Sequence, residues 1–231
     1  MKRLILAGEP PVEVTLRISA RAKRLSLRVS QLDGSVSLTL PRRVSMREAQ
    51  AFLGERAEWV RKHVAATPAQ VRLAPGGEVP FAGRAHRLVA SGGRAARLGD
   101  GVITLPLGAP EKTGPRVAAL FKALARDRLD AASMRHAAAL GRSYTGLTLR
   151  DTRSRWGSCS PEGRLMYSWR LVMAPPEVLD YVAAHEVAHL AEMNHSAPFW
   201  AHVARLMPDY AKHRQLLRKN GVKLHAYRFR D

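Results

Sequence analysis

The chain has 231 residues, 46% of them hydrophobic, which is enough for a real core in one large or two small domains and argues against disorder. Only four consecutive apolar residues (Leu4 to Ala7) follow Lys2-Arg3, so we expect no secretory signal, and no segment approaches membrane-spanning length. The single cysteine, Cys159, excludes a disulfide within the chain, and we therefore expect a cytoplasmic location.

The charge is strongly positive and unevenly distributed. Lys and Arg outnumber Asp and Glu by 38 to 19, with 26 against 11 in residues 1–150 and 12 against 8 in residues 151–231. Such a field favours polyanions such as nucleotides, nucleic acid or an anionic membrane surface. The alternative is that the arginines only solvate the surface, because no nucleic-acid-binding motif is present and aromatic residues are few.

The first part of the chain is predicted to be rich in β-structure. Alternating apolar residues predict strands at 12–18, 25–29 and 36–40, with a hairpin turn at Asp33-Gly34. Ser45 and Glu48 form a capping-box pattern that begins a helix running to about residue 66. Short strands are expected near 79–81, 86–90 and 102–105, because glycines separate these apolar runs.

The second part is predicted to be mainly helical. After a linker at 106–115, a long helix is expected from Pro115 to Leu140, ended by Gly141. Strands follow near 147–149 and over 164–172, then a mostly apolar helix over 178–193, and finally helices near 197–207 and 209–220, the last ended by Gly221. We therefore predict an α+β protein with a β-rich N-terminal part, residues 1–110, and a catalytic domain, residues 111–231.

His185-Glu186-Val187-Ala188-His189 is the feature that indicates a chemistry. On a helix, histidines at i and i+4 lie on one face and can bind one metal ion, the arrangement found in zinc hydrolases. Asn194 is expected to form a left-handed helix cap whose turn brings His195 to the same point as a third ligand. Three protein ligands leave a position for water, so the pattern predicts catalytic zinc, one ion per chain, with Glu186 as the general base.

Several alternatives remain open at this site. Glu192 lies on the same helical face as His185, Asp209 lies in a turn, and His202 lies on the next helix, so each is a weaker candidate for the third ligand. Three imidazoles also suit iron, cobalt or manganese. Cys159 is predicted to be a small buried residue, although its thiolate could instead close the open metal position.

The chain resembles the YgjP-like metallopeptidase family of the zincin superfamily. The resemblance rests on the following segments: Arg155-Trp156-Gly157-Ser158-Cys159, Trp169-Arg170-Leu171, Tyr181 to Glu186, and Asn194-His195-Ser196 with Phe199-Trp200. It extends more weakly to Arg21-Ala22-Lys23-Arg24 and Trp59. The resemblance implies a zincin-like unit in which a backing helix and a small mixed sheet flank the metal helix. It also implies zinc ligation by His185, His189 and His195 and a catalytic role for Glu186.

Three functions are compatible with these features. The first is a zinc metallopeptidase acting on peptide or protein substrates, in which Arg155 and Tyr210 are candidate donors to the oxyanion. The second is a metal-dependent nucleoside triphosphate hydrolase on the same site, with Arg153, Arg155 and Arg170 attracting the substrate; the absence of a Walker-type glycine loop argues against it. The third is a non-enzymatic zinc protein that binds nucleic acid. No feature indicates an oligomeric state.

Overall fold

The protein, described here from a computed structural model over residues 3–230, consists of two compact units, residues 1–70 and residues 71–231. We call them the first and the second unit. The division falls forty residues before the predicted boundary at residue 110. The reason is that the strands between residues 78 and 105 share one hydrophobic core with the long helix that follows them, so they belong to the second unit.

The first unit is a four-stranded sheet covered by two helices. The strand order is β1-β2-β4-β3, with β2 and β4 parallel and the outer pairs antiparallel. Alternating residues of β2 and β4, such as Val14 and Leu38, are fully buried against Leu53 and Val60 of the helices. The strands are β1 (Arg3–Leu6), β2 (Val12–Ser19), β3 (Ser26–Val29) and β4 (Val36–Pro41).

The helical segment of the first unit begins where it was predicted to begin, but it is interrupted in the middle. The Ser45 side chain accepts a hydrogen bond from the Glu48 backbone and the Glu48 carboxylate accepts one from the Ser45 backbone, which is the predicted capping box. The single predicted helix is in fact two, α1 (Met46–Glu55) and α2 (Ala57–Ala65). The break falls at Arg56, two residues after Gly54, a residue that weakens a helix interior.

A small sheet opens the second unit and supports the rest of it. Its order is β6-β7-β9-β8, and its turn residues Ala82 and Gly83 both have positive φ, as in the tight turns of hairpins. The backbone N–H groups of these two residues donate to the carbonyls of Val172 and Met173, which lead into the helix of the predicted metal site. The strands of this sheet are β6 (Glu78–Phe81), β7 (Arg84–Ala90), β8 (Arg97–Leu98) and β9 (Val102–Leu105), and β5 (Val71–Arg72), which precedes them, is not part of it.

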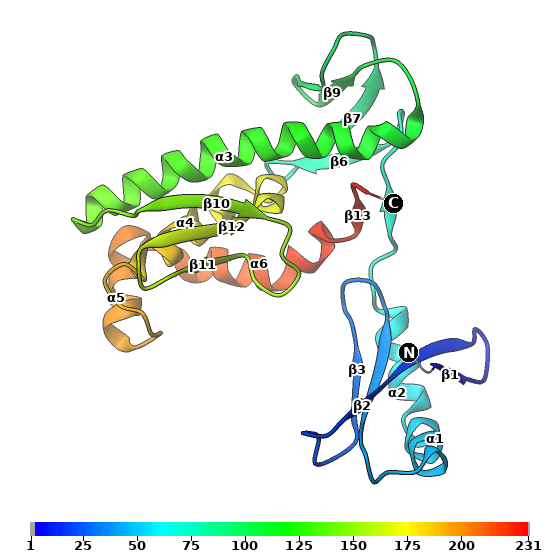
Figure 1. Ribbon diagram of the computed structural model, residues 1–231. Coiled ribbons are helices and arrows are strands. Elements are labelled where there is room, and N and C mark those ends of the chain that lie inside the picture. The colour runs from blue at the N-terminus through cyan, green and yellow to red at the C-terminus, as the bar shows by residue number, and fades with distance from the viewer. Residues whose placement is uncertain (1–2, 231) are drawn as a thin grey trace. The chain divides into compact units, whose positions relative to one another are not determined.

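Helix α3 (Thr113–Leu140) is the backbone of the second unit. It follows the short helix η1 (Pro110–Lys112) and ends, as predicted, at Gly141, which has the left-handed conformation. One end of α3 lies near the β6–β9 sheet, and its length runs beside α4 (Pro176–Ala188) and the sheet β10-β12-β11 (Figure 1). Phe121, Leu129 and other apolar residues of α3 are completely buried in this shared core. The mixed helix and sheet composition confirms the predicted α+β class at that level.

The remaining elements differ from the prediction in specific ways. The predicted strand 164–172 is a strand only to Ser168, and its second half is the buried helix η2 (Trp169–Met173). Gly157–Cys159, which lies between the two predicted strands, forms a further strand, β11. Helix α6 continues past Gly221, which is buried inside the helix rather than ending it. The elements are β10 (Gly146–Arg150), β11 (Gly157–Cys159), β12 (Arg164–Ser168), α5 (Ala197–Leu206), α6 (Tyr210–Leu224) and β13 (Tyr227–Arg228), which pairs with β5.

Within residues 3–230, none of the helices combines the length and the hydropathy that a membrane-spanning segment requires.

Candidate metal centre

Helix α4 forms because its sequence begins with proline and continues with apolar residues that are buried on most sides. Pro176 occupies the start, where a missing N–H is not a loss, and Glu177 lies at the positive end of the helix dipole. The helix ends at Ala188, five residues before the predicted end, and His189 is its C-cap in a right-handed conformation.

The chain reversal after α4 differs from the predicted left-handed cap. Asn194 does not have a positive φ. Instead, backbone hydrogen bonds from residues 190–192 to the carbonyls of Val187 and Ala188 tighten the turn. The side-chain oxygen of Asn194 then accepts the Ser196 N–H just before α5 begins. The turn still brings His195 back to the end of α4.

Three histidine side chains converge at this turn. His185, His189 and His195 each place one ring nitrogen within 4.8 Å of the other two. The Nε2 atoms of His185 and His195 are 3.1 Å apart. His189 is buried, His185 is half-buried and His195 is exposed, so the cluster opens to solvent on one side. It is a group that could hold a metal ion.

The chemistry of the three imidazoles fits a metal ion. The Nδ1 atom of His189 lies 2.9 Å from the carbonyl of Glu192, which fixes the ring and leaves Nε2 free for a ligand. Burial, reinforced by the two neighbouring histidines and by Arg214, lowers the pKa of His185 to about 3, and burial also lowers the pKa of His189. Both rings are therefore held in the neutral form that binds metals.

Glu186 lies beside the cluster and is 6% exposed. Burial raises the pKa of its carboxyl group to about 8, and the charge of Arg155 opposes this rise. The backbone of Gly157 in β11 packs directly on this carboxylate. A methyl group added at Gly157 would lie 2.5 Å from Oε1 and 2.6 Å from Cγ of Glu186, so only glycine leaves room for the carboxylate where it stands.

The segment before β11 is anchored by Trp156, the neighbour of Gly157. Its backbone carbonyl accepts the Ser168 N–H at 2.8 Å, which joins it to the end of β12. Its ring lies against Gly221 of α6, where an added methyl group would be 3.0 Å from the indole, and 5.0 Å from the ring of His225. Gly221 therefore serves as a packing position for Trp156, and this contact holds the segment before β11 against α6.

Aromatic rings of α5 form one wall of the cluster. The Phe199 ring centroid is 4.5 to 4.9 Å from those of all three histidines. The Trp200 ring stacks on His195 at 5.9 Å and on Tyr210 at 5.4 Å. The guanidinium carbon of Arg214 lies 4.5 Å from the Trp200 ring centroid, so a cation–π contact from α6 stabilises the position of this ring.

The predicted oxyanion donors occupy different surroundings. Arg155 is exposed in the segment before β11, close enough to Glu186 to influence its pKa. Tyr210 is half-buried at the first position of α6, with its ring against Trp200. No described partner accepts or donates a hydrogen bond at the Tyr210 hydroxyl.

The weaker ligand candidates do not join the cluster. Glu192 contributes its backbone carbonyl to His189, as described above. Asp209 accepts a hydrogen bond from His213 at 2.8 Å, and its carboxylate is largely exposed. His202 lies half-buried on α5. Among the described residues, the three-histidine group contains neither these side chains nor Cys159.

Two further side chains that were expected near the site, those of Arg170 and Cys159, are held by contacts within the fold. Arg170 is buried, pairs with Asp151 through two hydrogen bonds, and donates to the carbonyls of Leu224 and Tyr227. It is therefore not free to attract a nucleotide. The Cys159 thiol is half-buried and lies 3.4 Å from the carbonyl of Ser160, and burial, followed by the charge of Glu186, raises its pKa to about 11.

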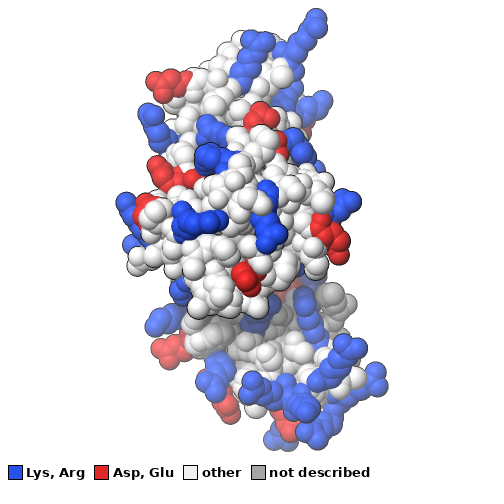
Figure 2. All heavy atoms as spheres, turned by 90° about the vertical axis from the view of Figure 1, so that its left-hand side faces the viewer, with Lys and Arg blue, Asp and Glu red and all other residues white. Residues whose placement is uncertain are grey.

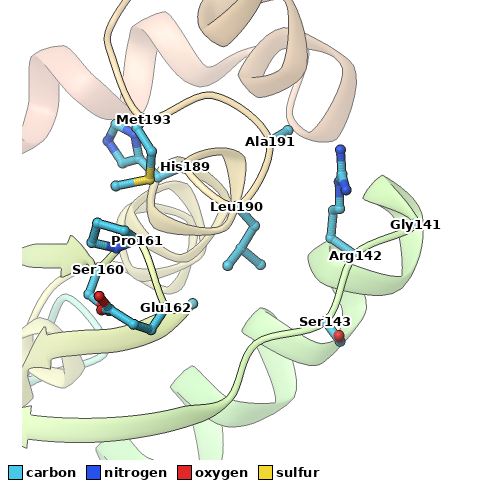
Figure 3. A pocket seen from close by; sticks show the side chains of 11 residues that line it. Gly141, Arg142, Ser143, Ser160, Pro161, Glu162, His189, Leu190, Ala191 and Met193 are labelled. Carbon is cyan, nitrogen blue, oxygen red and sulfur yellow. The ribbon is translucent and has the colours of Figure 1, made fainter.

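A cavity of about 650 Å³ lies next to the histidine cluster. His189 and Met193 border one side, Arg142 after the end of α3 borders the other, and Leu190 lies between them (Figure 3). The remaining lining residues include Ser160 and Glu162, which follow β11 directly. The cavity is large enough for a substrate side chain, and His189 is the member of the histidine cluster that borders it.

Sequence reasoning missed the roles of Gly157, Phe199, Trp200 and Arg214. Gly157, Phe199 and Trp200 lie in the segments that carry the family resemblance, but their spacing alone does not reveal which neighbour they touch. A glycine in a strand often marks close approach of another group, and that signal was available for Gly157. Arg214 has no comparable signal, because it resembles any exposed arginine of a helix.

Comparison with known proteins identifies one family. A sequence profile described as YgjP-like, metallopeptidase domain, matches residues 23–220. No curated protein matches the chain. Among solved structures, the crystal structure of the metallopeptidase zymogen of Pyrococcus abyssi abylysin is similar to 41% of this chain and 93% of that chain, with 20% sequence identity and a TM-score of 0.34.

Proposed function

Because the chain belongs to the YgjP-like metallopeptidase family and is thus a metal-dependent hydrolase, we propose that it is a zinc-dependent peptidase whose general base is Glu186. The observation that carries this proposal is the convergence of three histidine nitrogens within 4.8 Å beside a buried glutamate. The family also implies a peptide or protein substrate.

His185, His189 and His195 would hold one zinc ion. Such an ion, when bound, supplies a Lewis acid that polarises the scissile carbonyl and lowers the pKa of a coordinated water to about 7. The fixed Nδ1 contact of His189 and the aromatic wall keep the three rings oriented for this task. We propose that α4, the neighbouring α3 and the mixed sheet β10-β12-β11 form the zincin-like unit that the family resemblance implies.

Glu186 would move the proton. Its carboxylate, held between α4 and Gly157, accepts a proton from the attacking water and returns it to the leaving amine. Burial favours this role, because a proton acceptor is most effective when its pKa lies near the working pH. The two proposed oxyanion donors are Arg155, whose charge acts on Glu186, and Tyr210, whose ring stacks on Trp200.

Two features support an extended peptide as substrate. Strand β11 is at the edge of its sheet, since it pairs only with β12 among the described strands, so a peptide can align along it through backbone hydrogen bonds. The cavity between His189 and Arg142 then offers space for a substrate side chain. Both lie next to Glu186 or the histidines.

The proposal is tested by metal content and turnover measured together. Wild type, His195→Ala and Glu186→Gln are purified, analysed for metal, and assayed against peptides, unfolded protein and nucleoside triphosphates with and without chelator. We expect one zinc per chain, weakened binding in His195→Ala, and chelator-sensitive peptide hydrolysis that is lost in Glu186→Gln although zinc remains bound. Full turnover by Glu186→Gln with zinc bound would refute the role of the base, and hydrolysis of nucleotides alone would replace the substrate class.

A further inference from the structure

The first unit carries a groove that the proposed catalytic site does not use. Its lining consists of residues from the β2–β3 segment and from the two helices, and its volume is about 340 Å³. All of these residues belong to residues 1–70, so the groove is complete within that unit. They are Arg24, Leu25, Ser26, Leu27, Phe52, Arg56 and Trp59.

One side of the groove is an open sheet edge. In the order β1-β2-β4-β3, strand β3 pairs with β4 on one side and has no described strand on the other. Ser26 and Leu27 of this strand line the groove. An edge strand presents unpaired N–H and C=O groups, which can pair with an extended polypeptide.

The opposite side of the groove is aromatic. Trp59 of α2 is 41% exposed, which is a large apolar surface to leave in water. Phe52 of α1 lies beneath the guanidinium of Arg56, whose central carbon is 5.8 Å from the ring centroid. A chain that paired with β3 would therefore find apolar surface for its side chains across the groove.

The charges at the groove are positive. Arg24 and Arg56 are exposed, and neither has an ion pair within the described part of the chain. The first unit as a whole has 13 Lys and Arg against six Asp and Glu, and basic side chains predominate on its visible face in the lower part of Figure 2. An occupant of this groove gains most by carrying acidic side chains.

We propose that this groove binds an extended, acidic segment of another polypeptide, which adds to the edge of β3 and packs apolar side chains on Trp59. This binding activity is separate from the proposed peptidase site and does not depend on it. A peptide fits better than single-stranded nucleic acid for two reasons. The ring of His63 already packs 4.2 Å from that of Trp59, which restricts base stacking. The free edge of β3 also matches a peptide backbone and not a phosphate backbone.

The experiment measures binding to the full-length chain carrying Glu186→Gln, so that hydrolysis does not interfere. The probe is a fluorescein-labelled decapeptide of alternating Glu and Val, followed by fluorescence anisotropy. Comparison probes are a Lys and Val decapeptide, an alternately N-methylated Glu and Val decapeptide that cannot pair as a strand, and a ten-nucleotide oligothymidine. Variants are Arg24→Glu and Trp59→Ala, with Arg47→Glu as a charge-matched control on the exposed face of α1 outside the groove.

We expect the Glu and Val probe to bind, and Arg24→Glu or Trp59→Ala to weaken its binding about tenfold or more, while Arg47→Glu changes it little. The N-methylated and Lys and Val probes should bind much more weakly. The proposal is overturned if the Glu and Val probe does not bind at 1 mM, if N-methylation has no effect, or if Arg47→Glu weakens binding as much as Arg24→Glu. It is also overturned if oligothymidine binds more tightly with the same sensitivity to Arg24→Glu and Trp59→Ala. Thermal unfolding of each variant confirms that the loss is not one of folding.

Discussion

Gly157→Ala tests whether the position of the Glu186 carboxylate is set by the backbone of β11. The added methyl carbon would lie 2.5, 2.6 and 2.7 Å from Oε1, Cγ and Cδ of Glu186, where ordinary contacts begin near 3.4 Å. The carboxylate must therefore retreat by roughly 0.7 to 0.9 Å. Because the atoms that yield belong to a side chain and not to the backbone, we expect the fold to survive at a cost of about 1–3 kcal/mol.

The consequence for catalysis is larger than the consequence for stability. A displacement of this size in a catalytic group reduces the rate by about 100-fold. We expect kcat to fall by that order in Gly157→Ala while the metal content stays near that of wild type, because the three atoms nearest to the new methyl group all belong to Glu186 and none to a histidine.

The assay combines steady-state peptide hydrolysis with metal analysis. Gly146→Ala is the matched control: Gly146 begins β10 of the same sheet, and a methyl group there meets nothing within 4 Å. If Gly157→Ala retained more than half of the wild-type kcat, catalysis would not depend on the position of the Glu186 carboxylate that Gly157 sets. Loss of metal together with activity would instead show that Gly157 is needed to keep the three histidines in position to bind metal.

Three further predictions follow from the surroundings of the site. Trp200→Ala should weaken metal binding about 10- to 100-fold in chelator competition, because His195 loses the ring on which it stacks, whereas Trp200→Phe should recover most of the affinity; equal effects of the two variants would contradict this role. Cys159→Ser should leave activity and metal content nearly unchanged, and alkylation of the wild-type thiol should accelerate about tenfold per pH unit between pH 8 and pH 10, as a pKa of about 11 requires; a marked rise in activity would indicate that the thiolate had closed the metal position. Asp180 links α4 to His136 and Arg135 of α3, and although burial pushes its pKa up, the hydrogen bond from His136 and the neighbouring positive charges hold that pKa below the ordinary value. Its contribution is therefore present at neutral pH and is lost progressively as the pH falls below about 4 and through the lowered pKa, so Asp180→Asn should lower the free energy of unfolding by about 1–2 kcal/mol at pH 7 and by less at each lower pH below 4 in urea titrations.

Local patterns were sufficient for much of the fold. The capping box at Ser45, the stop of α3 at Gly141 and the alternation in β2 and β4 are each determined by neighbouring residues, and each is found as predicted. The prediction was wrong for the second half of strand 164–172, because that segment is determined by packing against distant residues and not by its neighbours in the chain. Its apolar residues suit any buried element, and packing against α3 makes them the helix η2.

The boundary between the two units could not be predicted from local sequence patterns either. Pro106 to Pro115 has the composition of a linker, yet Leu88 and Ile103 before it and Phe121 after it are buried in one core. Whether two neighbouring segments belong to one unit depends on which surfaces they bury together, and glycine or proline content does not report this.

By itself, the sequence determined which residue types could hold a metal ion and activate water. The spacing of His185, Glu186 and His189 follows from helix geometry, whereas His195 was predicted as the third ligand from a left-handed cap at Asn194, a cap that the turn does not contain. The ligation and the role of Glu186 are still proposals, but the predicted meeting of the three rings is what the structure displays.

Only the tertiary structure decided what surrounds these groups. The contact of Gly157 with Glu186, the support of Trp200 by Tyr210 and Arg214, and the use of Arg170 to join four segments all bring together residues far apart in the chain. Such contacts depend on how the faces of packed helices and strands meet, whereas the metal-binding pattern lies within one helix and the turn after it. That difference in range is why the sequence predicted the reacting groups and not the groups that hold them.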